Sequence, residues 1–98
     1  MNDQERNDLI KHRLARSRET LNEVEALCEN EYWNGVVNRL YYSCYYAVIG
    51  LLLKESIVAQ THAGVRQMFG LHFIQTNKIN RELGKFYSEL FDKRQTGD

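Results

Sequence analysis

The segment Asn38–Ala47 places one arginine and four tyrosines inside a stretch that otherwise reads as an apolar helix. An unpaired buried hydroxyl or charge costs about 1–3 kcal/mol or more. These groups must therefore either face a polar cleft or satisfy one another across an interface. A guanidinium supplies fixed positive charge and a two-pronged donor for phosphate. The segment thus predicts a phosphate or nucleotide site around Arg39, or alternatively an aromatic interface.

The spacing of the tyrosines assigns them to faces of the helix. With about 100° per residue, Tyr42 and Tyr46 lie roughly 60° and 20° from Arg39 around the helix axis. Tyr41 and Tyr45 share a different face. We expect Arg39, Tyr42 and Tyr46 to line the candidate site together. The alternative is aromatic packing at a helix or dimer interface, with the hydroxyls reaching its rim.

Hydrophobic spacing predicts two long helices that would position these residues. A stripe over residues 4–29, capped by Asn2 or Asp3, consists of Ile10, Leu14, Leu21, Val24 and Cys28. After a break at 29–31, a second helix over about 32–54 carries two neighbouring stripes, formed by Val36, Leu40, Cys44, Ala47 and Leu51 and by Trp33, Val37, Tyr41, Val48 and Leu52. The second helix should therefore be central, and the short break predicts an antiparallel hairpin.

The remainder of the chain predicts shorter elements. Thr61 should cap a short helix over about 62–68 that ends near Gly70, and the apolar residues 71–74 should form a packed turn or helical stub. Asn80 should cap a last helix whose inward residues are Leu83, Phe86 or Tyr87, and Leu90, with Phe91 beside them.

These elements predict an all-α fold: an up-and-down antiparallel helical bundle of three longer helices and one short helix. With 98 residues we expect one domain over 1–98. Three long helices make a thin core, so we expect a dimer or an additional C-terminal helix to complete the burial.

Composition excludes several classes of protein. Basic and acidic residues number 13 each, which argues against an ordinary polybasic nucleic-acid binder. Residues 6–18 are nonetheless mostly basic and 19–31 acidic, which indicates either a phosphate-binding patch or a solvated helix face. The spacing of Cys28 and Cys44 matches no disulfide framework or zinc site, so we expect reduced thiols in the cytoplasm. The N-terminus does not resemble a signal peptide, and the apolar run Ala47–Leu53 is too short to cross a membrane.

Taken together, three segments resemble the HEPN domain, in particular its small stand-alone prokaryotic members. They are Asn38–Ala47 with its arginine and paired tyrosines, Thr61–Gly70 with its histidine and glycine, and Leu90–Gln95. The resemblance extends from about Ile10 to Asp98. It implies a helical bundle that dimerises through the second helix and its neighbours. It also implies a minimal nucleotidyltransferase as partner, in a module of the toxin–antitoxin kind.

Active members of this family are metal-independent ribonucleases with an arginine, four to six intervening residues and a histidine, which meet in a cleft across the dimer. Arg39 matches the arginine, but the histidine position falls at Tyr46, and shorter spacings end at Cys44 or Tyr45. Histidine titrates near neutral pH and tyrosine near 10. Tyr46 would orient a phosphate but would be a poor base unless its pKa were strongly lowered. Some members carry AMP on a motif tyrosine, which makes Tyr46 or Tyr42 an acceptor by analogy.

The three histidines are possible stand-ins for the missing base. His62 matches the family's histidine before the short third helix, where it is either structural, as a capping residue, or part of the cleft. We expect His72 to be a packing residue and His12 to face solvent. Arg39 is either a phosphate ligand or the partner of an acid such as Glu25. Arg94 should pair with an acidic residue.

We therefore predict a HEPN protein that binds a nucleotide or RNA through Arg39, Tyr42, Tyr46 and His62. Because Tyr46 stands at the histidine position, we expect it to be the catalytically degenerate partner of a nucleotidyltransferase. The first alternative is a metal-independent endoribonuclease that uses Arg39 and Tyr46 at a composite dimer cleft. The second is a purely structural helical dimerisation domain. We expect no cofactor and no metal, because the sequence has no glycine-rich phosphate loop and no metal-ligand spacing.

Overall fold

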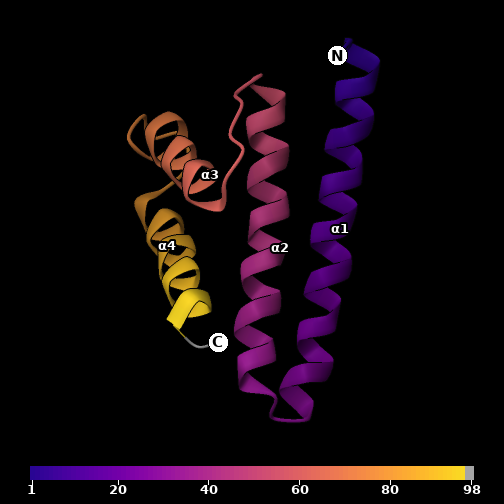
Figure 1. Ribbon diagram of the computed structural model, residues 1–98, viewed down its shortest axis with the longest axis vertical. Helices are drawn as coiled ribbons and strands as arrows, with labels where there is room; N and C mark the ends of the chain where they lie inside the picture. Colours follow the sequence, from indigo (N-terminus) through magenta and orange to yellow (C-terminus); the bar gives the residue numbers. More distant parts are fainter. Residues whose placement is uncertain (97–98) are drawn as a thin grey trace.

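The computed structural model describes residues 1–96, which form four α-helices and one π-helical segment (Figure 1). Their bounds are Asp3–Glu29 for α1, Trp33–Lys54 for α2, His62–Phe69 for α3, Gly70–Ile74 for η1 and Arg81–Thr96 for α4. The long helices α1 and α2 run antiparallel, and α3, η1 and α4 lie on the other side of α2 from α1 (Figure 1). The predicted all-α bundle of three longer helices and one short helix is confirmed.

Three side-chain caps fix where the helices begin. The backbone N–H of Glu5 donates to Asn2 Oδ1 at 2.8 Å, that of Gly64 to Thr61 Oγ1 at 2.9 Å, and that of Leu83 to Asn80 Oδ1 at 2.9 Å. Each bond satisfies a backbone donor that has no partner within its own helix. All three caps were predicted from the sequence. The expected helical stub at 71–74 is η1, a π-helical turn that continues α3.

The core lies between α2 and the short helices, as the two apolar stripes of α2 predict. Tyr41 is completely buried, and Val48 and Leu52 are nearly so. The short elements and α4 contribute Val65, Phe69, Phe73, Tyr87, Leu90 and Phe91. Among the described helices, α1 packs against α2 alone, and the one fully buried residue of α1 is Thr20. Of the two alternatives on α4, Tyr87 is the inward residue.

Several residues expected in the core are exposed instead. Leu14 and Leu21 on α1 are 37% and 51% exposed, and Trp33 is 58% exposed. On α4, Leu83 and Phe86 are 55% and 45% exposed. Periodicity identifies an apolar stripe but does not say how many neighbours cover it. Because α1 has a single neighbour, the flank of its stripe remains open to solvent.

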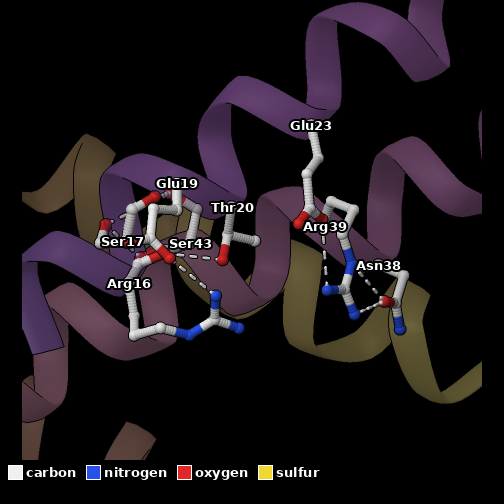
Figure 2. Close-up of polar contacts among 8 residues, drawn as sticks. All are labelled: Arg16, Ser17, Glu19, Thr20, Glu23, Asn38, Arg39 and Ser43. Atoms are coloured by element: carbon white, nitrogen blue, oxygen red, sulfur yellow. Dashed lines mark hydrogen bonds and ion pairs between the residues drawn. The ribbon is translucent and has the colours of Figure 1, made fainter.

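A polar seam joins α1 to α2 (Figure 2). The Ser17 hydroxyl donates to the Ser43 carbonyl at 2.7 Å, and the Ser43 hydroxyl donates to the Ser17 carbonyl at 2.8 Å. These small residues allow the two helices to approach closely, and the paired bonds fix their register. The seam thereby places Arg16 and Glu23 of α1 beside the tyrosine-rich half of α2.

Helix α2 is long and apolar enough to cross a membrane, as judged by its length and composition. The expectation that the apolar run is too short considered only Ala47–Leu53. The central helix of a water-soluble bundle meets the same criterion, and α2 is contacted by α1, α3 and α4. In this fold its apolar residues are used for helix packing.

Candidate phosphate site on the arginine–tyrosine surface

Arg39 lies at the surface of α2, held by its neighbours (Figure 2). Its Nη2 and Nε donate to Asn38 Oδ1 at 2.6 and 3.1 Å, and its Nη1 lies 3.5 Å from Glu23 Oε2. The ion pair therefore involves Glu23 and not the expected Glu25. The arginine side chain is 31% exposed and that of Glu23 is 51% exposed. A long, exposed ion pair contributes little to stability, so an incoming phosphate can replace Glu23 at small cost.

Arg39 also borders a hollow of about 470 Å³ between α1 and the start of α2. The other lining residues are Glu23, Ala26, Leu27 and Gly35. Tyr42, Tyr46 and His62 do not line this hollow. Tyr42 instead lies beside the guanidinium, with Arg39 Cζ 5.4 Å from its ring centroid.

Tyr42 is flanked by a second arginine that sequence reasoning did not assign to the site. Arg94 of α4 donates from Nη1 to the Tyr42 hydroxyl at 3.2 Å, and its Cζ lies 5.7 Å from the Tyr42 ring centroid and 4.6 Å from that of Tyr41. Within residues 1–96 no carboxylate pairs with Arg94, so the expected acidic partner is not found among the residues that the structure describes. Its Nε is buried and has no hydrogen-bond partner.

The spacing of residues along α4 could have predicted that Arg94 faces α2. Arg94 follows the buried residues Phe91 and Tyr87 by three and seven positions, a spacing that puts all three on one face of α4. The arginine therefore points toward α2 and not toward solvent. The side chain of Arg94 is half-buried, so its guanidinium can also donate to an anionic ligand that reaches Tyr42.

His62 joins the tyrosines from the start of α3. Its Nδ1 lies 2.8 Å from the Tyr41 hydroxyl, and its ring stacks on Tyr45 with centroids 4.2 Å apart and planes inclined by 14°. The capping residue of α3 is Thr61, so His62 does not act as a cap. His12 is exposed, as expected, and His72 is half-buried on η1. Of the three histidines, His62 is the one that belongs to the tyrosine cluster.

The arginine that lies beside the Tyr46 ring is not one of the two that lie beside the Tyr42 ring. Arg16 of α1 lies with its Cζ 5.4 Å from the Tyr46 ring centroid, and Glu19 accepts a hydrogen bond from Arg16 at 3.1 Å. The tyrosines contact one another as well, with the Tyr42 and Tyr46 centroids 6.1 Å apart. Arg39 and Tyr46 thus share a face of α2, and Tyr42 with its neighbours lies between them.

Burial shifts the pKa of three groups in the cluster. Burial raises the pKa of Tyr41 and of Tyr45, although Arg94 opposes the rise at both. The pKa of His62 is lowered, first by burial and then by the positive charge of Arg94. At neutral pH these shifts favour the neutral phenols of Tyr41 and Tyr45 and the neutral imidazole of His62, beside the guanidiniums. Such groups can bind phosphate and stack on bases, and the imidazole can accept a proton.

The lowered pKa of His62 makes stability depend on pH. A histidine that stays neutral in the folded state contributes stability that is present above its ordinary pKa of 6.5 and is lost as pH falls through the lowered value. We expect the midpoint of urea unfolding to decrease as pH falls below that ordinary pKa, and His62→Gln to flatten this decrease.

The matching measurement is an NMR titration of the histidine ring protons, with His62 expected to titrate below 6.5, its ordinary pKa. A His62 midpoint at or above 6.5 would contradict the lowered pKa of this half-buried imidazole.

Comparison with known proteins decides the family. The HEPN domain profile matches residues 10–98. The chain belongs to the HEPN family. No solved structure matches the chain. In the described part of this HEPN domain, no group of three or more histidine, cysteine or acidic side chains could hold a metal ion.

Named relatives come from bacteria and archaea. A UPF0332 protein of Thermotoga maritima is 41% identical over 98 residues, which is 100% of this chain and 73% of the relative. A Methanocaldococcus jannaschii protein named "putative toxin" is 36% identical over 85 residues, or 87% of this chain and 58% of that protein. A UPF0332 protein of Pyrococcus horikoshii is 38% identical over 68 residues, which covers 69% of this chain and 48% of the relative.

Proposed function

We propose that this HEPN domain, taken as a single unit over residues 1–98, binds the phosphates of RNA or of a nucleotide at the arginine–tyrosine surface. This surface comprises Arg16, Arg39, Arg94, Tyr42, Tyr45, Tyr46 and His62, and the buried Tyr41 lies beneath it. The observation that carries the proposal is the placement of Arg39 and Arg94 on one phenol ring, that of Tyr42, with a buried Arg94 donor unsatisfied. Each guanidinium can donate to a phosphate while a base stacks on the neighbouring rings.

The biological setting that we propose is a two-component module of the toxin–antitoxin kind. The Methanocaldococcus jannaschii relatives carry the name "putative toxin", which supports a toxin-like role. The partner is a minimal nucleotidyltransferase, the protein acts in the cytoplasm, and it works as a homodimer. Co-expression with a nucleotidyltransferase that is encoded beside this protein, followed by affinity purification, tests the pairing. A HEPN protein that elutes alone at every salt concentration would contradict it.

We further propose that the site binds without cutting. Tyr46 stands where active family members have histidine, and it contacts Arg16 and other tyrosines. A phenol ordinarily titrates near 10, so it is a poor general base at neutral pH. Tyr46 and Tyr42 would orient the phosphate by hydrogen bonding, and neither would serve as a general base.

The position of His62 favours a second candidate function, a metal-independent endoribonuclease. Its imidazole stacks on Tyr45 and feels the charge of Arg94, and its lowered pKa keeps it neutral at pH 7. A neutral imidazole can accept the proton of a ribose 2′-hydroxyl. The guanidiniums would then stabilise the charge that develops on phosphorus. In this reading His62 replaces the motif histidine from outside α2.

One experiment separates these functions. Binding of a labelled single-stranded RNA and its cleavage are measured together in EDTA, for the wild type and for Arg39→Ala. We expect binding without cleavage, and binding weakened by at least about tenfold in the variant, because a hydrogen bond to a charged group contributes about 1.5–3 kcal/mol. The matched control is Arg81→Ala, an exposed arginine at the opposite end of α4 from Arg94.

Each outcome is decisive. Cleavage that Arg39→Ala and His62→Gln both remove would favour the endoribonuclease. Equal binding by the wild type and Arg39→Ala would place the ligand elsewhere. No binding of RNA by either would exclude RNA as the ligand and leave a nucleotide ligand or the structural dimerisation domain.

A further inference from the structure

The hollow beside Arg39 combines one acid, one base and apolar walls. Among the described residues that line it, Glu23 and Arg39 carry charge, and Ala26, Leu27 and Gly35 form the walls. Its volume of about 470 Å³ lies within the range of about 300–1,000 Å³ that is usual for sites that bind small molecules. A ligand that fits therefore needs apolar faces and an edge with both hydrogen-bond donors and acceptors. A nucleobase has both.

The glycine at position 35 keeps one wall of the hollow open. A Cβ atom at this position would lie 3.3 Å from Leu27 Cδ2, so a larger residue would crowd the Leu27 side chain at the wall. Glycine also weakens the helix in which it stands. The space that Gly35 leaves thus belongs to the hollow, at some loss of helix stability.

Glu23 and Arg39 lie close enough to meet the same edge of a base. Glu23 Oε2 is 3.5 Å from Arg39 Nη1, which is longer than the usual hydrogen bond of about 2.7–3.2 Å (Figure 2). Nη1 carries two hydrogens, and both carboxylate oxygens have lone pairs, so each group can bind a ligand as well. The Glu23 side chain is 51% exposed, which leaves its carboxylate accessible.

Guanine has the edge that engages these two groups most completely. Its O6 accepts a hydrogen bond, and the adjacent N1–H and N2–H donate. Arg39 Nη1 would donate to O6, and the two oxygens of Glu23 would accept from N1–H and N2–H. Adenine and cytosine each offer one donor beside one acceptor, so one carboxylate oxygen would remain without a partner. Uracil offers one donor between two carbonyl oxygens, which repel a carboxylate.

We propose that this hollow is a guanine subsite, in which Glu23 selects the base. The inference rests on the proposed function, because binding of the phosphate at the arginine–tyrosine surface brings the base to the hollow. Arg39 borders the hollow and also lies beside Tyr42, so one guanidinium can serve the base and its phosphate. The subsite adds the identity of the base to that function, together with an acidic residue that determines specificity.

Exchange of a single base tests the subsite. Fluorescence anisotropy gives the dissociation constants of short labelled uridine strands that carry one central guanosine, inosine, adenosine or cytidine. Inosine lacks only the 2-amino group of guanosine, and all strands carry the same phosphates. We expect the wild type to bind the guanosine strand at least about tenfold more tightly than the inosine strand, because the hydrogen bond from N2–H goes to a charged group.

The variants place this preference on Glu23. Glu23→Gln retains the size of the side chain but exchanges one acceptor oxygen for a donor, and should reduce the ratio of the two dissociation constants to less than about threefold. Glu25→Gln is the matched control, because Glu25 is rotated by about 200° around α1 and does not line the hollow. It should retain the full ratio. A loss of fold would weaken the binding of all strands alike and leave the ratio unchanged.

Gly35→Ala tests the hollow itself. The added methyl group crowds Leu27 at the wall and should lower the preference for guanosine. Urea unfolding should show no loss in the free energy of unfolding, because alanine favours the helix more than glycine does. A full preference in this variant would mean that the base does not enter the hollow.

The outcomes separate this subsite from the proposed function. Equal binding of the guanosine and inosine strands would overturn the guanine subsite and leave the phosphate site in place, as would a preference that Glu23→Gln retains. No binding of any strand or of GMP would overturn both. Competition with GMP and IMP identifies the source of the base. Displacement of the guanosine strand by GMP as readily as by unlabelled strand would support a free nucleotide, and displacement by the strand alone would support RNA.

Discussion

Tyr41→Ala is expected to lower the free energy of unfolding by about 3–5 kcal/mol, the usual cost of removing a large buried aromatic ring. Tyr41 is completely buried, and its ring is stacked on that of Tyr87 with centroids 5.8 Å apart and planes inclined by 5°. The centroid of the Tyr41 ring also lies 6.1 Å from that of Phe91 and 4.6 Å from Arg94 Cζ. A cavity here would separate α4 from α2. Domains of this size have about 5–15 kcal/mol in total, so the variant should be close to unfolding.

Urea unfolding followed by far-ultraviolet circular dichroism measures this loss. Tyr32→Ala is the matched control, because Tyr32 is 63% exposed and its removal should change stability by less than about 0.5 kcal/mol. Tyr41→Phe retains the ring and removes only the hydroxyl that contacts His62, so it should cost about 0.5–1.5 kcal/mol. Comparable losses in Tyr41→Ala and Tyr32→Ala would show that Tyr41 is not the centre of the core.

The sequence predicted well the features that depend on neighbours along the chain. Asn2, Thr61 and Asn80 cap the helices because a side-chain acceptor three residues before an unsatisfied N–H is a local arrangement. The central position of α2 followed from its two apolar stripes, since a helix with a wide apolar arc needs several neighbours.

What the sequence could not supply was the choice among neighbours in space. The spacing of Leu14 and Leu21 fits a buried apolar stripe. Among the described helices α1 contacts α2 alone, with Ser17 at the contact, so both leucines remain partly exposed to solvent. Arg39 pairs with Glu23 and not Glu25, because two residues along a helix rotate the side chain by about 200°. That choice depends on the register of α1 on α2, which the reciprocal Ser17 and Ser43 bonds set.

In the candidate site, too, the residues within one helix could be predicted from the sequence, and the contacts between helices could not. The arginine and tyrosines of α2 were recognisable because they lie within one helix, where spacing gives the face. His62 was a candidate whose position relative to α2 was open, since it follows a loop of seven residues at 55–61. Arg94 was assigned an acidic partner because most helix arginines have one. Only the packing of α4 against Tyr41 brings it to Tyr42.

Removing both guanidiniums that flank Tyr42 is expected to have the largest effect on ligand binding. We expect Arg39→Ala and Arg94→Ala each to weaken RNA binding by about 1.5–3 kcal/mol, and the double variant to bind no better than background. If both arginines hold the same phosphate, their losses should not add, and the interaction energy should exceed about 0.5 kcal/mol. Fluorescence anisotropy of a labelled single strand measures the four affinities of this cycle.

Arg94 also supports the fold, so its variants need a measure that packing alone does not change. Arg94→Lys retains the charge and loses the planar fork, and should bind more weakly than the wild type but better than Arg94→Ala. The dependence of affinity on salt provides that measure, because each phosphate contact that is lost lowers the slope of log affinity against log salt by about 0.7 for a single strand. A double variant with reduced stability but an unchanged salt slope would mean that the two arginines hold helices together. Reduced slopes in both single variants, with unfolding measured alongside, would assign Arg39 and Arg94 to the bound phosphate.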